Sequence, residues 1–255
     1  MKASDFLGIF GLLATCQSQC LIKIGVILPF QDFNRVAWSW SLPKVKGGIT
    51  YAIDTVRNRS DLLPGCEIEV NYGDSQCSET FGPLVAVDMF YHQKAYVFLG
   101  PGCDYALAPI ARFSPHWNIP VLTAGGMVRA FSDKKGEFRQ LTRIGGSYSD
   151  LGRAMSNHLE MFSWNRVGLI YNEHQGKRSS KGKTNCWFVM EGMYWPLRQK
   201  LGLKYPGENI WYKAFDEHAE PDENLDNISS ILEEAKTKTR SKRKSDNFSV
   251  LFLAG

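Results

Sequence analysis

The feature that most constrains the fold is a regular alternation of apolar, strand-length segments with segments of helical periodicity. Residues 21–30 form an apolar run of strand length, and residues 44–58 place apolar side chains at helical spacing. The alternation continues with strands predicted at 67–73, 95–100 and 119–125 and helices at 81–92 and 105–117. This β-α-β-α-β-α-β order predicts an α/β fold in which a parallel sheet carries helices on both faces.

The same alternation begins again near residue 146, which predicts a second lobe. Helices are predicted at 146–162, 186–201 and 227–238, and strands at 166–173, 209–215 and 248–255. Ser147 is the expected cap of the first of these helices. The chain stops on a strand, so we interpret residues 19–128 as a complete first lobe and residues 129–255 as a truncated second lobe.

Residues 1–18 have the features of a secretory signal peptide. Lys2 supplies a positive end, residues 6–14 form an apolar run, and small residues follow it. The run is too short to span a bilayer, and no later run approaches about 20 apolar residues. The alternative is a bacterial lipoprotein signal that ends at Cys16. The sequence therefore predicts entry into the secretory pathway.

Secretion makes disulfides the expected state of several cysteines. The candidates have no zinc-ligand spacing, so no metal site is expected; they are Cys66, Cys77, Cys103 and Cys186, with Cys20 as a further candidate. Three glycosylation sequons agree with this route, at Asn58, Asn227 and Asn247.

Charge and motif content exclude two broad functional classes. The formal net charge is +4, but the basic residues concentrate in the segments 177–183 and 236–244, and the rest of the chain is acidic. A nucleic-acid-binding fold would spread Lys and Arg over one groove. The histidines form no metal or triad motif, and residues 182–184 lack the glycine that a phosphate-binding loop requires. We therefore expect neither nucleic-acid binding nor an enzyme in this fragment.

The segment Gly100-Pro101-Gly102-Cys103 joins a predicted strand directly to a predicted helix. The first amides of such a helix have no partner within the helix and lie at the positive end of its dipole, so the turn suits an anion. Within the helix, Ala106, Ile110 and Phe113 are spaced to face the sheet, whereas Tyr105 and Arg112 share another face. For the turn, the alternative is a tight turn that serves folding alone. For the face with Tyr105 and Arg112, the alternative is an ordinary solvated stripe.

The segment that contains this turn resembles a known family. FLGPGCDYALAPIARFSPHWNIPVLTAGG (98–126) is similar to the hormone-binding domain of natriuretic peptide receptors, the receptor guanylate cyclase family. Further similar blocks follow in the family's order, among them YGDSQCSE, KGEFRQLTR, GSYSDLG and NCWFVMEG. The resemblance covers roughly residues 24–255 and implies the periplasmic-binding-protein type I fold, which has two Rossmann-like lobes.

The resemblance also implies a function. Family members bind a disulfide-ringed peptide hormone between two receptor protomers on the extracellular side of the plasma membrane. They signal through an intracellular cyclase that makes cyclic GMP, or they clear the hormone. A homodimer and a membrane segment beyond this fragment are therefore expected. The resemblance further implies a chloride ion at Ser75, Gly102 and Cys103, a Cys77–Cys103 disulfide, and no other cofactor.

The resemblance also implies which residues of this chain contact the peptide. They are Glu79, Tyr105, Arg112, Glu137, Phe138, Trp187, Glu191 and Phe215. Two departures concern the second lobe: Ala214 stands where an acid is expected, and Leu253 stands where a cysteine would partner Cys186. The alternative function is a receptor or binding protein of the same fold that takes a small, amino-acid-like ligand in the cleft between the lobes.

Overall fold

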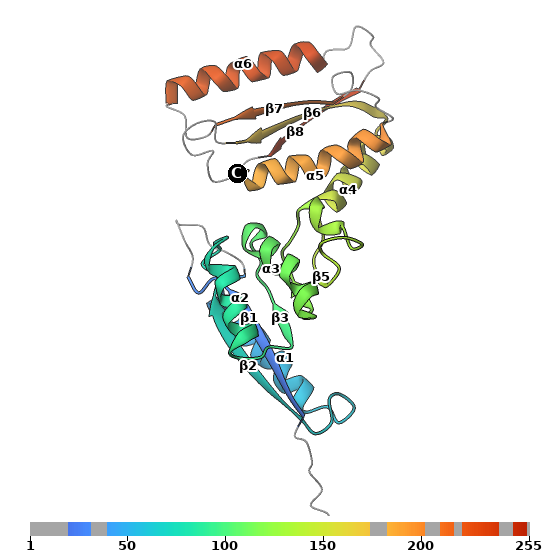
Figure 1. Ribbon diagram of the computed structural model, residues 1–255. Helices are drawn as coiled ribbons and strands as arrows, with labels where there is room; N and C mark the ends of the chain where they lie inside the picture. Colours follow the sequence, from blue (N-terminus) through green and yellow to red (C-terminus); the bar gives the residue numbers. More distant parts are fainter. Residues whose placement is uncertain are drawn as a thin grey trace, which may run out of the picture.

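The computed structural model describes residues 20–31, 40–173, 183–201, 210–216, 221–239 and 247–253, so the expected signal peptide lies outside the described residues. These residues form two lobes, each built on a parallel sheet with helices against it (Figure 1). The repeated strand and helix pattern of the sequence is therefore confirmed.

The first lobe is a five-stranded sheet with the order β2-β1-β3-β4-β5. Its strands are β1 (Cys20–Leu28), β2 (Cys66–Asp74), β3 (Val97–Leu99), β4 (Val121–Thr123) and β5 (Leu141–Arg143). Its helices are α1 (Leu42–Arg57), α2 (Phe81–Tyr91) and α3 (Asp104–Trp117), followed by the 3₁₀ turn η1 (Arg129–Ser132).

The alternation of side chains along β1 separates two apolar layers in this lobe. Ile27 points into the main core, with Met89 of α2, Phe98 of β3 and Ile110 of α3. Val26 and Leu28 point to the opposite face, where Leu42 of α1 covers them. Helices therefore lie on both faces of the sheet, as the sequence predicts.

The boundary between the lobes lies later in the chain than expected. We predicted it at residue 128, but β5 pairs in parallel with β4, and Phe131, Phe138 and Leu141 belong to the main core of the first lobe. The first lobe therefore continues through Arg143. The strand β5 was missed because Leu141 is its one apolar residue, so it lacks the apolar run that marks β3 and β4 in the sequence.

The second lobe is a three-stranded sheet with the order β7-β6-β8. Its strands are β6 (Trp164–Asn172), β7 (Ile210–Phe215) and β8 (Asn247–Leu253), and its helices are α4 (Tyr148–Met161), α5 (Asn185–Lys200) and α6 (Pro221–Thr239). The helices α4 and α5 cover one face of the sheet and α6 the other (Figure 1). Ser147 caps α4 in a capping box with Asp150, as its position predicts.

The cysteines form two disulfides, Cys20–Cys66 and Cys77–Cys103. The second bridge is the one expected from the resemblance, and the first links the starts of the paired strands β1 and β2. Cys186 takes part in neither bridge and is buried in the core of the second lobe. Among the described helices, none is long and apolar enough to cross a membrane.

Of the sequon asparagines, Asn58 is exposed at the C-terminus of α1. Asn227 and Asn247 fall in α6 and β8, and their side chains lie outside the described residues.

Candidate functional site

The N-terminus of α5 is fixed against the end of β6 by one side chain. The Thr184 hydroxyl donates to the carbonyl oxygen of Asn172 (2.9 Å) and accepts from the amide of Trp187 (3.2 Å). This cap satisfies one of the free amides at the start of the helix. It also fixes the position of Trp187 and Phe188, which follow in the first turn.

Tyr105, in the first turn of α3, lies opposite the N-terminus of α5. Its hydroxyl accepts a hydrogen bond from the Lys183 amide (2.7 Å) and lies 3.0 Å from the Lys183 carbonyl oxygen, to which it donates. Its ring lies 5.7 Å from that of Phe188, which in turn meets Trp187 edge to face at 5.4 Å. Partial burial is the main cause that raises the pKa of the Tyr105 phenol. These contacts join the first lobe to the second.

We call this group the aromatic junction: Tyr105, Trp187 and Phe188. Tyr105 retains 37% of its exposure, and the two α5 rings are half-buried. Lys183 closes one side, where its Nζ lies 5.4 Å from the centre of the Trp187 ring and 2.6 Å from Oε1 of Glu173. Sequence reasoning missed Lys183 and Phe188, and only the capping pattern around Thr184 could have pointed to them.

Two other predicted contact residues lie near this junction. Glu79 is exposed and close enough to Tyr105 to raise the pKa of its phenol, and it forms no ion pair within the described residues. Phe215 is half-buried at the carboxyl end of β7, where it pairs in register with Asn172. The junction therefore combines partly exposed rings with a carboxylate that has no ion-pair partner in the described part of the chain.

The predicted pair of Glu137 and Phe138 is arranged differently from the expectation. Phe138 is only 4% exposed and packs edge to face on Phe131 at 5.0 Å, so it is a core residue of the first lobe. Arg112 covers it, with the guanidinium carbon 5.3 Å from the ring centre, and donates to Glu137 at 2.7 Å. Phe138 is therefore buried rather than a surface contact, and Glu137 is neutralised by its own chain.

Glu191 is likewise paired within the chain. Its Oε1 accepts from Nε of Arg129 at 2.8 Å, and the carboxylate side chain is 18% exposed. Arg129 lies on η1 of the first lobe, so this ion pair is a second link between the lobes. The predicted contact residues thus divide into three groups rather than one continuous surface.

The expected spacing of α3 is confirmed for Ala106 and Ile110, which are fully buried. Phe113 differs, because it is 40% exposed and rests on Trp117 at 5.3 Å. Leu107, Ala111 and Ser114 complete the buried face instead.

The turn before α3 is tightly enclosed. A side chain at Gly102 would meet the Trp40 ring at 2.6 Å, so only glycine fits there. The Cys77–Cys103 bridge joins this turn to residues 75–77, where Gln76 and Cys77 have φ values of 49° and 52°. Ser75 is fully buried, and its Oγ accepts from the Cys77 amide at 3.3 Å.

The carboxyl group of Asp104 begins α3 beside this turn. Burial raises its pKa from 3.8 to about 6, although the amides of Val128 and Met127 and the charge of Arg143 offset part of that effect. Its Oδ1 is buried and has no hydrogen-bond partner among the residues that the structure describes.

Comparison with known proteins agrees with this architecture. Residues 44–188 match the family model described as the receptor family ligand binding region. The chain is 32% identical over 218 residues to atrial natriuretic peptide receptor 3 of Mus musculus, which is 83% of this chain and 37% of that receptor. It is 34% identical over 182 residues to atrial natriuretic peptide receptor 2 of Homo sapiens, which is 69% of this chain and 16% of that receptor.

The chain thus spans 37% or less of the length of these relatives. The family match covers more than half of the chain, and the paired parallel sheets described above have the arrangement that the family resemblance implies. The chain belongs to the receptor family defined by this ligand-binding region and has its periplasmic-binding-protein type I fold.

Proposed function

We propose that this chain is the extracellular ligand-binding domain of a natriuretic-peptide-type receptor and that it binds a peptide hormone at the aromatic junction. The observation that carries the proposal is the partly exposed set of rings on α3 and α5 beside Glu79, which forms no ion pair within the described residues. Aromatic side chains that become fully desolvated contribute most of the energy of protein interfaces. Glu79 supplies the charge that an arginine-bearing peptide would meet.

Glu137 and Glu191 play a different part in this proposal from the one expected. Because Arg112 and Arg129 already neutralise them, pairing with the hormone would first require those ion pairs to break. We assign them to positioning the two arginines, and we assign direct contact to Glu79, Tyr105 and Trp187, with Phe215 at the edge.

The proposed partner protomer fits the outer face of α2. The inner face of this helix is buried through Gly82, Ala86 and Met89. Its outer face exposes an apolar stripe of Phe81, Leu84, Val87 and Tyr91, which are 42–63% exposed. An exposed apolar patch of this kind is typical of protein interfaces, so we propose a homodimer that forms through α2.

A chloride ion at the turn before α3 is part of the same proposal. The amides of Gly102 and Cys103 and the hydroxyl proton of Ser75 have no acceptor among the described residues. Donors of this kind at the start of a helix are suited to a small anion. Ser75, Gly102 and Cys103 would hold the ion, and the disulfide keeps the two segments together.

The steps that follow hormone binding would involve other parts of the whole protein. We propose that a membrane segment follows in the whole protein and that hormone binding either drives an intracellular guanylate cyclase or leads to hormone clearance. The ligand-binding region itself is not the catalytic part.

Hormone binding can be tested with atrial natriuretic peptide, after which the relatives are named. Trp187→Ala should weaken binding by at least about tenfold and Glu79→Gln by less, because buried rings contribute more than exposed charges. The effect of Glu79→Gln should shrink further at high salt. Tyr51→Ala is the matched control, because Tyr51 is 76% exposed on α1. Equal binding by the Trp187 variant and the wild type would refute the proposed surface.

A further inference from the structure

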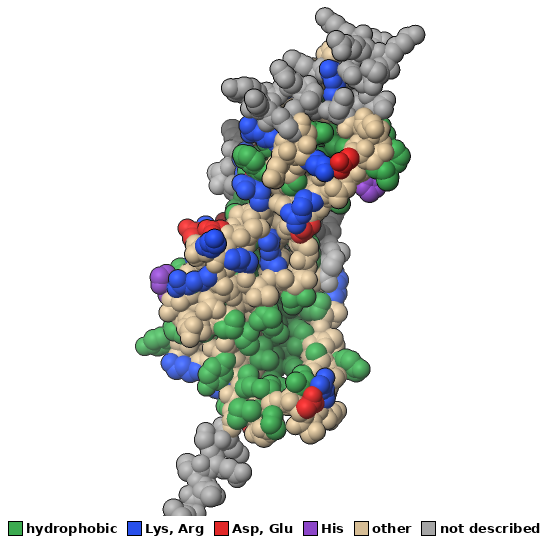
Figure 2. Space-filling view, turned by 90° about the vertical axis from the view of Figure 1, so that its right-hand side faces the viewer, with side chains coloured by type: hydrophobic (Ala, Val, Ile, Leu, Met, Phe, Trp, Pro, Cys, Tyr) green, Lys and Arg blue, Asp and Glu red, His purple; other side chains and the backbone are tan. Residues whose placement is uncertain are grey.

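A cavity lies away from the aromatic junction, where η1 of the first lobe meets α4 and α5 of the second. It has a volume of about 660 Å³ and is lined by Arg129, Ser132, Ser149, Arg153, Trp195, Pro196, Arg198 and Gln199. On the face seen from the side of α4 and β5, Lys and Arg side chains gather around the middle of the molecule (Figure 2). The cavity is therefore cationic and joins the two lobes.

Several hydrogen-bond donors in this cavity have no acceptor among the residues that the structure describes. Only Nε of Arg129 is engaged, by Glu191, so its two Nη groups have no acceptor among the described residues. Arg153 uses one Nη for Asp150, and its other nitrogens have no acceptor in the described structure. Guanidinium groups with unused donors are suited to bidentate binding of an oxyanion.

A buried hydroxyl group points to a ligand independently of the arginines. Ser149 is only 8% exposed, and its Oγ is buried with no hydrogen-bond partner among the described residues. A buried polar group without a partner costs free energy unless a ligand or water satisfies it. Ser132 adds a second hydroxyl, which accepts from Arg143 at 2.8 Å and keeps its own proton available.

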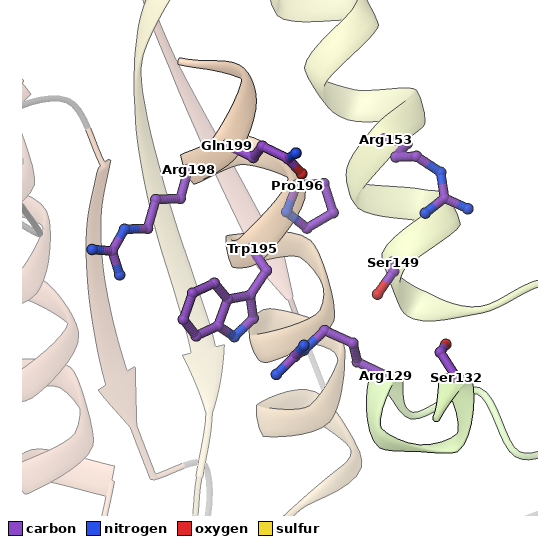
Figure 3. Close-up of a pocket in the computed structure, with 8 residues that line it drawn as sticks. All are labelled: Arg129, Ser132, Ser149, Arg153, Trp195, Pro196, Arg198 and Gln199. Carbon is purple, nitrogen blue, oxygen red and sulfur yellow. The ribbon is translucent and has the colours of Figure 1, made fainter. Parts of the chain in front are cut away.

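The close-up shows which lining groups converge. Ser132, Ser149 and Arg153 lie on the side of η1 and α4, the guanidinium group of Arg129 lies beneath Trp195, and Arg198 extends from the other side of Trp195 (Figure 3). Trp195 supports Arg129, whose guanidinium carbon lies 5.0 Å from the ring centre. Trp195 and Pro196 also give the cavity an apolar wall. A bare inorganic ion would fill only part of this volume.

We propose that this cavity is a binding site for a small organic oxyanion, in which a phosphate or sulfate group binds Arg153, Ser132 and Ser149, with Arg129 beside it under Trp195. The organic part of the ligand lies against Trp195 and Pro196. The site is separate from the proposed hormone surface, because its residues come from η1, α4 and the second half of α5. A ligand here bridges the first lobe to the second and stabilises their contact.

Isothermal titration of the full chain with phenyl phosphate at fixed ionic strength tests the proposal. Phenyl phosphate should bind saturably and more tightly than inorganic phosphate, because its ring uses the apolar wall, and phenol should not bind. Phenyl sulfate distinguishes the two oxyanions, and its binding would assign the site to sulfate esters as well.

Variants separate a built site from general electrostatic attraction. Ser149→Ala and Arg153→Gln should each weaken phenyl phosphate binding about tenfold, the usual scale for one charge-assisted hydrogen bond. Arg198→Gln is the matched control, because it removes the same charge from the same cavity outside the converging group. Absence of saturable binding would overturn the proposal. The proposal would also be overturned if Arg198→Gln and Arg153→Gln weakened phenyl phosphate binding equally and Ser149→Ala did not change it.

Discussion

The hydroxyl of Tyr105 and the backbone of Lys183 exchange two hydrogen bonds, at 2.7 and 3.0 Å, across 78 residues of sequence. The hydroxyl accepts from the amide and donates to the carbonyl group of the same residue. One phenol oxygen on the first lobe thus fixes the segment that leads into α5 of the second lobe.

Replacing Tyr105 with Phe should remove this link and keep the ring. We expect the free energy of unfolding to fall by about 1 kcal/mol, since exposed neutral hydrogen bonds contribute modestly. Urea denaturation measures the change. Tyr96→Phe serves as the control, because Tyr96 is 61% exposed and its hydroxyl has no partner in the described structure. An equal effect in both variants would contradict the role given to Tyr105.

Phe138→Ala should destabilise the first lobe strongly. The ring is buried against Phe131, so its removal leaves a cavity and should cost about 3–5 kcal/mol. The loss should appear in thermal melting whether or not hormone is present. Phe113→Ala is the comparison, because Phe113 is 40% exposed and should cost much less. A Phe138 variant with unchanged melting would show that the residue is not part of the core.

Removing the Cys77–Cys103 bridge should affect both stability and the proposed chloride site. The bridge closes 26 residues, and the chain-entropy model gives about 3.5 kcal/mol for its loss. The double variant Cys77→Ser, Cys103→Ser should also lose any dependence of stability on chloride at fixed ionic strength.

The control for this experiment is Cys20→Ser, Cys66→Ser, whose bridge closes 46 residues at the start of β1 and β2. Its stability should fall by about 4 kcal/mol, and its chloride response should remain. A wild-type chain whose stability does not respond to chloride would reject the ion site and leave the disulfide result standing.

Asp104 should make stability depend on pH in a defined direction. Its pKa is raised from 3.8 to about 6 by burial, so between these values the folded chain binds more protons than the unfolded chain. The contribution of this group to stability is therefore present at low pH and is lost as pH rises toward about 6.

Asp104→Asn should remove that dependence. At neutral pH the variant should be more stable than the wild type by up to about 3 kcal/mol, and the difference should vanish below the ordinary pKa of the carboxyl group. Denaturation of both proteins across this range gives the difference directly, because the other titrating groups cancel. A difference that stays constant with pH would show that Asp104 titrates normally.

The sequence by itself determined the order of strands and helices, because apolar periods of 2 and 3.6 are local properties of the chain. It predicted the two-lobe α/β architecture, the capping residue Ser147 and the buried face that contains Ala106 and Ile110. The resemblance added the Cys77–Cys103 bridge.

Only the tertiary structure decided which charges and rings remain available to a partner. Glu137 and Arg112 are 25 residues apart, and Glu191 and Arg129 are 62 apart, so no local pattern reveals that they neutralise each other. Phe138 follows an exposed glutamate in a segment without a period, and its burial depends on Phe131 and the sheet beneath it. Long-range packing sets these outcomes, because the free energy of a contact depends on what the rest of the chain brings to it.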